Sequence, residues 1–205
     1  MRRSLAVACV TAALAAGCDP PEPETAVGYA LPDPAHLRRL DSVALVELNH
    51  EGPPEGLSRD MTAALAKSIG SRKLFYTKVV RREDPALETT ALDAGPKSVQ
   101  ELAEIRRAVG CNAVLLGSIT HFEQYPRMQI GLFLQLFDLR EGRIVWALEH
   151  TWDTTDRTTE ERIREYFNEK MTDEYDPLEW RLAMLSPRVF EKYVAHEVAQ
   201  TLSQQ

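Results

Sequence analysis

The sequence predicts an α/β domain built on a mixed sheet of about five strands, with helices packed on its faces. Strand-like and helix-like apolar patterns alternate over the first half of the folded part, and three strand-like segments then follow one another over residues 113–152. The expected element order is β-α-β-α-β-β-β-α-α. The alternating half favours parallel neighbours, and the three successive strands favour an antiparallel meander.

The first half supplies two strands and two amphipathic helices. Residues 42–49 and 73–80 are the strands, and the helix between them has apolar positions every three or four residues and is expected to end at Gly70. Ser98 begins the second helix, because a glutamate three residues later completes a capping box, and Gly110 ends it.

The meander begins with residues 113–120, a nearly continuous apolar run that is typical of a strand buried on both faces. Residues 127–139 alternate, with Phe133 and Phe137 on one side and aliphatic residues on the other. The aliphatic side consists of Met128, Ile130, Leu132, Leu134 and Leu136. Gly142 can take the positive φ of a hairpin loop before the third strand, residues 144–152.

The tail from residue 154 onward returns to helical spacing. Residues 158–170 are charged with one apolar side, and Pro177 interrupts the segment that follows, in which Trp180 is expected to pack. Ser186 and Pro187 predict the start of a last helix, as N-cap and first helical residue.

The first 17 residues resemble a bacterial export signal. Arg2 and Arg3 precede an apolar stretch, residues 5–16, that is too short to span a bilayer. The stretch ends in Leu-Ala-Ala-Gly-Cys, which resembles the lipobox of bacterial lipoproteins, with Ala15 in the usual place of leucine. The resemblance implies cleavage before Cys18 and lipidation of that cysteine, with palmitate among the anchoring acyl chains. An ordinary cleaved signal, in which Cys18 is incidental, is the alternative.

We expect three parts: a lipoprotein signal peptide over residues 1–17, a lipidated cysteine and Pro-rich tether over residues 18–40, and a single domain over residues 41–205. Five prolines fix φ along the tether, which predicts an extended segment without helix. Tyr29 and Leu31 leave open that this segment lies along the domain.

The charge balance is acidic. The chain carries 24 Lys and Arg against 31 Asp and Glu, and loss of the two leader arginines takes the formal charge from −7 to −9. This charge argues against nucleic acid as a partner and against direct adhesion to anionic lipid. Cys111 would be the one unmodified cysteine of the exported chain, and its place before a buried strand predicts a core thiol.

Two stretches resemble a known family. Residues 110–120 read GCNAVLLGSIT and residues 138–146 read DLREGRIVW. They are similar to motifs of the periplasmic lipoproteins grouped with the curli-secretion protein CsgG and the penicillin-binding-protein activator LpoB, whose shared domain is related to the N-terminal domain of TolB. The resemblance implies that the first motif enters a central strand and the second turns a hairpin. Asn112 replaces the usual Asp, and Glu141 and Arg143 replace the usual Thr and Glu.

The histidines and carboxylates offer two hypotheses about chemistry. His121 and His150 could meet across the meander and hold a metal with Glu123 or Glu149, although polar residues at strand ends explain them equally well. A set of carboxylates is either a solvated helix face with arginine counter-charges or a source of paired catalytic acids, and no pair is selected. This set comprises Asp153, Asp156, Glu160, Glu161 and Glu165. We therefore expect no metal, no cofactor and no enzymatic activity.

Phe122 and Tyr125 lie in a connection between two strands, where exposed aromatic residues are good contact residues. We predict a non-enzymatic cell-envelope lipoprotein on the periplasmic face of a membrane, which binds another envelope protein in assembly, secretion or regulation of a cell-wall synthase. The alternative is a periplasmic domain that binds a small molecule or glycan in a pocket near His121, Tyr125 and Trp152. The choice of membrane and self-association are left open.

Overall fold

The computed structural model describes residues 27–30, 34–84, 98–170 and 185–203, and six strands form one mixed sheet within them. The strand order is β1-β6-β5-β4-β2-β3. β2 (Ser42–Val46) pairs in parallel with β3 (Tyr76–Val80) and with β4 (Ala113–Glu123). β5 (Gln129–Asp138) pairs antiparallel with β4 and with β6 (Arg143–Asp153). The predicted α/β class, the parallel half and the antiparallel meander are confirmed.

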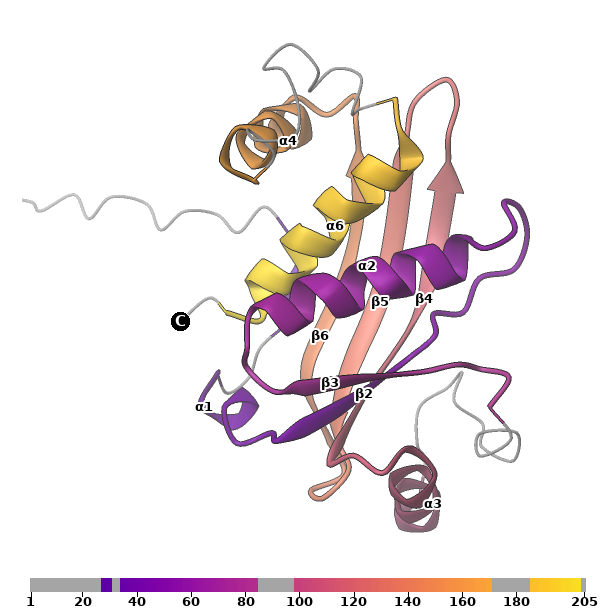
Figure 1. The fold of residues 1–205 in the computed structure, drawn as a ribbon, viewed down its shortest axis with the longest axis vertical. Helices are drawn as coiled ribbons and strands as arrows, with labels where there is room; N and C mark the ends of the chain where they lie inside the picture. The colour runs from indigo at the N-terminus through magenta and orange to yellow at the C-terminus, as the bar shows by residue number, and fades with distance from the viewer. Residues whose placement is uncertain (1–26, 31–33, 85–97, 171–184, 204–205) are drawn as a thin grey trace, which may run out of the picture.

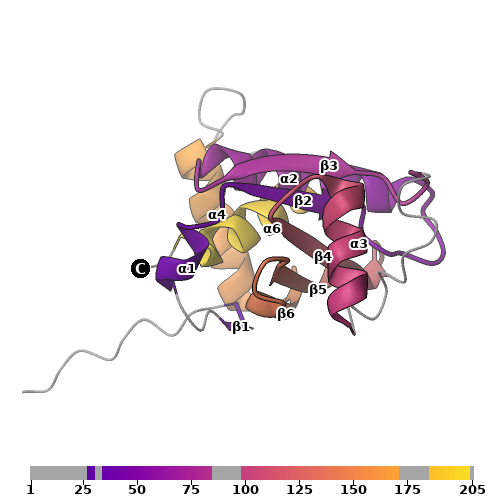
Figure 2. The same cartoon turned by 90° about the horizontal axis from the view of Figure 1, so that it is seen from below.

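Helices cover the two faces of the sheet unequally. α2 (Leu57–Ser71) and α6 (Pro187–Thr201) lie side by side across one face, and α4 (Arg157–Lys170) adds Ile163 and Phe167 to the same core (Figure 1). The other face has a smaller core under α3 (Val99–Val109), beside the turn that joins β5 and β6 (Figure 2). Toward the β4–β5 hairpin this second face carries the exposed Thr120, His121 and Thr151.

The alternation predicted for β5 is confirmed. Met128, Ile130, Leu132, Leu134 and Leu136 all belong to the core under α2 and α6. Phe137 belongs to the core under α3, and Phe133 is half-buried on the same side of the strand. Cys111 is a buried free thiol in that second core, as expected.

Several element ends also lie where the sequence places them. The hydroxyl of Ser98 accepts a hydrogen bond from the N–H of Glu101 at 3.2 Å, and Gly110 closes α3 with φ 67°. Gly142 has φ 68° in the hairpin turn, and Pro187 is at the first turn of α6 after the N-cap Ser186. Ser98, Gly110, Gly142 and Pro187 each use the local property that predicted them. Ser186 occupies the N-cap position, but its side chain makes no capping hydrogen bond.

The expectation of an extended, helix-free tether is wrong in part. Pro34 opens the short helix α1 (Pro34–Leu37), which is possible because the first turn of a helix does not use the N–H that proline lacks. Before it, β1 (Tyr29–Ala30) pairs antiparallel with β6, and this pairing adds the sixth strand. Leu37 and Leu40 are buried in the main core, so this segment lies along the domain.

Two predicted boundaries shift by a few residues. α2 continues past Gly70 to Ser71, so Gly70 lies inside the helix rather than after it. Lys73 has φ 54°, a left-handed conformation that delays the extended backbone, and the next strand begins only at Tyr76.

The leader, Cys18 and Trp180 lie outside the described residues. Within the described ranges, no helix combines the length and apolar character needed to cross a bilayer.

Two glycines show how differently the fold treats this residue. A Cβ on Gly117 in β4 would lie 2.5 Å from the carbonyl oxygen of Phe133 and 2.5 Å from Cδ2 of Leu134, because β5 approaches closely there. A Cβ on Gly70 in α2 would meet nothing within 4 Å.

We expect opposite effects from alanine at these two positions. Gly117→Ala forces the backbone of β5 to move and should lower the free energy of unfolding by about 3 kcal/mol. Gly70→Ala should raise it by about 0.5–1 kcal/mol, because alanine has the higher helix propensity and restricts the unfolded chain. Urea denaturation measures the free energy of unfolding of both variants. An unchanged midpoint for Gly117→Ala would contradict the close approach of β5 to Gly117.

Candidate functional site

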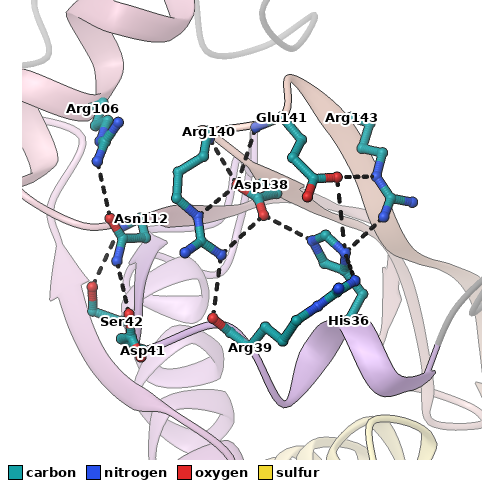
Figure 3. Close-up of polar contacts among 10 residues, drawn as sticks. All are labelled: His36, Arg39, Asp41, Ser42, Arg106, Asn112, Asp138, Arg140, Glu141 and Arg143. Atoms are coloured by element: carbon teal, nitrogen blue, oxygen red, sulfur yellow. Dashed lines mark hydrogen bonds and ion pairs between the residues drawn. The ribbon is translucent and has the colours of Figure 1, made fainter.

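A fully buried carboxylate, Asp138, organises the end of the sheet where β5 turns into β6 (Figure 3). Its Oδ1 accepts the backbone N–H of Arg140 at 2.7 Å, and its Oδ2 accepts from His36 Nε2 at 2.8 Å and from the Arg140 guanidinium at 3.3 Å. Burial alone would raise the pKa of Asp138, but the hydrogen bonds from Arg140 and His36 outweigh it and lower the pKa to about 2.

His36 brings α1 to this carboxylate and is itself 1% exposed. Its Nδ1 lies 2.8 Å from a guanidinium nitrogen of Arg39 and 2.7 Å from one of Arg143. Guanidinium groups can only donate, so Nδ1 is the acceptor and Nε2 carries the proton that is donated to Asp138. We call this set, with Arg140 and Glu141, the Asp138 network.

The ligand atoms of His36, Asp138 and Glu141 lie within 4.8 Å of one another, which is close enough to consider a metal ion. However, each of these atoms already faces a guanidinium. Nδ1 of His36 accepts from two arginines, Asp138 accepts from Arg140, and Glu141 Oε2 accepts from Arg143 at 2.7 Å. A divalent cation would have to displace three positive charges, so we assign the Asp138 network a structural role.

A groove of about 600 Å³ lies next to the Asp138 network, between α3 and the β5–β6 turn. We call it the α3–turn groove. Leu102, Ala103, Arg106 and Arg107 line it from α3, and Leu139, Arg140, Glu141 and Gly142 line it from the turn. The two walls are in contact, since a Cβ on Gly142 would lie 3.0 Å from Cδ1 of Leu102.

The two predicted contact residues lie at the opposite end of the sheet and differ in exposure. Tyr125 is 86% exposed in the hairpin between β4 and β5. Phe122 lies within β4 rather than in the connection, because β4 continues to Glu123, and its half-buried ring packs against the main core beneath α2 and α6. Of the pair, only Tyr125 therefore has its ring largely exposed to solvent.

The histidine pair considered for a metal does not form. His121 is opposite Gly131 on β5, whereas His150 is opposite Leu132, and neighbouring residues of a strand point to opposite faces. His150 contacts the fully buried Trp152 edge-on, with ring centroids 4.7 Å apart. His121 lies on the other face, so His121, Tyr125 and Trp152 do not line one pocket.

The carboxylates after β6 have separate structural partners. Asp153 accepts from the backbone N–H and the hydroxyl of Thr155, each at 2.8 Å, and from the side-chain amide of Gln129. Asp156 accepts from the backbone N–H of Thr159 at 2.9 Å and caps α4, and this hydrogen bond lowers the pKa of Asp156.

The arginines expected to pair with the carboxylates of α4 have different partners. Arg157 pairs with Glu161 at 3.1 Å, one turn further along α4. Arg162 instead reaches across to α6, where its Nε lies 2.8 Å from Glu197 and 3.2 Å from the hydroxyl of Tyr193. The latter contacts tie α4 to α6, which is a packing role that no local pattern indicates.

The arginines of the α3–turn groove were not singled out by the sequence. Arg106 and Arg107 read as the polar side of an amphipathic helix, and Arg140 reads as a turn residue. The available signal was the adjacent arginine pair in an acidic chain, but only the fold reveals that this helix lies beside the turn.

No family model and no curated protein matches the chain. Among solved structures, a PelC dodecamer from Paraburkholderia phytofirmans is 16% identical, with 65% of this chain and 86% of that chain covered and a TM-score of 0.46. The lipoprotein GNA1162 from Neisseria meningitidis is 15% identical, with coverages of 65% and 99% and a TM-score of 0.41.

LpoB from E. coli, a protein named in the motif resemblance, is also among the matching structures. It is 18% identical, with 74% of this chain and 82% of that chain covered and a TM-score of 0.37. The links to CsgG and TolB stay predictions.

The lowered pKa of Asp138 predicts a pH-dependent contribution to stability. The pKa falls from 3.8 to about 2 on folding, so the ionised carboxylate stabilises the fold above about pH 4, and this contribution is lost as the pH falls toward 2. Asp138→Asn should therefore lower the free energy of unfolding by about 2 kcal/mol at pH 7, and by progressively less below pH 4.

Urea titrations of wild type and variant from pH 3 to pH 7 measure this difference. Glu104→Gln, which removes an exposed carboxylate of α3, is the matched control and should change the free energy of unfolding only slightly. A difference between wild type and Asp138→Asn that stays constant over this pH range would contradict the assignment.

Proposed function

We propose that the protein is a non-enzymatic envelope lipoprotein, anchored through a lipid on Cys18, whose α/β domain binds another envelope protein on the periplasmic face of the membrane. The lipobox-like sequence around Cys18 supports the anchor. The observation that carries protein binding is the exposure of Tyr125 at the tip of the β4–β5 hairpin.

The surroundings of Tyr125 fit a contact site. The β4–β5 hairpin lies at one end of the sheet, and α3 and the β5–β6 turn, which form the α3–turn groove, lie at the other end (Figure 1). Tyr125 is 86% exposed, and Arg127 beside it keeps 49% of its side chain exposed while pairing with Asp153 at 3.6 Å. Tyrosine and arginine are among the residues enriched at the energetically important positions of protein interfaces.

The internal contacts of the acidic groups also favour binding over catalysis. Asp138, Asp153 and Asp156 each serve as hydrogen-bond acceptors for a turn or a helix start. These roles explain why the carboxylates are present, without reference to a reaction.

The anchor has a direct test. In a Gram-negative host given radioactive palmitate, the wild-type chain should take label and sediment with membranes. Cys18→Ser should take no label and stay in the soluble fraction, because it lacks the sulfur that carries the lipid. Unlabelled wild-type protein would contradict lipidation and reduce Cys18 to an incidental residue.

Protein binding is tested by replacing Tyr125 with a photo-cross-linking phenylalanine in cells of the source organism. Irradiation should give a discrete adduct with one envelope protein, identified by mass spectrometry. The matched control places the same group at Arg157, whose side chain is 90% exposed on α4, and should give no adduct. If position 125 gives none either, the hairpin is not the contact.

A further inference from the structure

The α3–turn groove concentrates positive charge in an acidic protein. Its lining holds three arginines, Arg106, Arg107 and Arg140, and one glutamate. That glutamate, Glu141, is paired with Arg143 at 2.7 Å, which offsets its charge. The whole chain carries a formal charge of −7, so the excess of arginine here departs from the average surface.

The three arginines differ in how far they are committed to internal contacts. Arg107 is exposed, and within the described ranges it has no hydrogen bond or ion pair. Arg106 is exposed and donates one hydrogen bond, to Asn112 at 3.3 Å. Arg140 is held by Asp138 and by the carbonyl of Arg39 at 3.2 Å, with 35% of its side chain exposed (Figure 3). One fixed guanidinium thus stands opposite two that can bind an external anion without losing an internal ion pair.

Two leucines of the lining pack into the core under α3. Leu139 is 5% exposed in the core under α3, and Leu102 packs against that core from the helix. Residues 102–107 extend roughly 8 Å along α3, which matches two or three residues of an extended peptide. An extended acidic peptide with an apolar side chain therefore matches the length, the charge and the apolar contacts of the groove.

We propose that the α3–turn groove binds an acidic segment of a partner protein, with carboxylates on Arg106 and Arg107 and an apolar side chain against Leu102 and Leu139. Arginine suits this role because its planar guanidinium can hold a carboxylate through two hydrogen bonds. The inference rests on the proposed protein-binding function and names the chemistry of the partner at a second site, at the other end of the sheet from Tyr125.

The test uses the exported protein carrying Cys18→Ser and a fluorescein-labelled octapeptide of alternating glutamate and leucine, with binding followed by fluorescence anisotropy. Arg107→Ala should weaken binding roughly fivefold. The double variant Arg106→Ala with Arg107→Ala should weaken it roughly tenfold or more, as expected for exposed charge pairs. Raising the salt concentration should weaken binding of the peptide to the wild-type protein. A variant with lysine in place of both Arg106 and Arg107 should bind more tightly than the double alanine variant and more weakly than wild type.

Matched controls separate this effect from general charge. Arg157→Ala removes an exposed arginine of α4 and should leave the affinity unchanged, and a peptide of alternating glutamine and leucine should bind at least roughly tenfold more weakly. Circular dichroism should show that every variant is folded. Wild-type affinity in the double arginine variant, or equal binding of the glutamine peptide, would overturn the proposal.

Two further outcomes would assign the groove to a different occupant. Binding of phosphatidylglycerol vesicles that is lost in the double arginine variant, without peptide binding, would overturn the proposal in favour of lipid. Glu88 and Asp93 are acidic residues that precede α3 in the sequence. If the double variant Glu88→Gln with Asp93→Asn binds the peptide more tightly than wild type, these residues compete for the groove, and the proposal of a partner segment as its occupant is overturned.

The Tyr125 site and the groove fail separately. Tyr125→Ala should leave the affinity for the peptide unchanged. A cross-link at position 125 without peptide binding rejects only this inference, whereas peptide binding without a cross-link rejects only the hairpin contact.

Discussion

The ionised carboxylate of Asp138 is the interaction on which the turn end of the sheet depends. It orders the β5–β6 turn through the backbone N–H of Arg140, and through His36 it holds a helix that lies 102 residues earlier in the chain. A buried charge without these donors would cost several kcal/mol, so the turn, α1 and the arginines around them form one unit. Within the turn, Gly142 adopts the left-handed backbone conformation that the turn requires, with φ 68°.

The unequal cover of the two faces leaves exposed side chains at both ends of the sheet. α2, α6 and α4 enclose one face with a continuous apolar core, whereas α3 encloses only the part of the other face beside the β5–β6 turn. Two surfaces result at opposite ends, one with the exposed ring of Tyr125 and one with the arginines of the α3–turn groove. The proposed binding of a partner protein would use these two surfaces and needs no deep cavity.

Local sequence rules performed well where a single residue determines the conformation. Ser98, Gly110 and Gly142 each do in the fold what their side chains, or the lack of one, predict. The same rules failed at Pro34 and Gly70, because proline is compatible with the first turn of a helix and glycine with its interior when packing favours the helix. The exposure of Tyr125 agrees with its place in a strand connection.

The sequence by itself determined the α/β class, the strand order of the meander, the faces of β5 and several helix ends, because these follow from periodicity and from residues acting on their own backbone. Only the tertiary structure decided that His121 and His150 lie on opposite faces, that His36 contacts Asp138, and that Arg107 and Arg140 line the same groove. These pairs are set by strand register and by the contact of α3 and α1 with a distant turn. Such long-range geometry has no signature in the residues near any one of them.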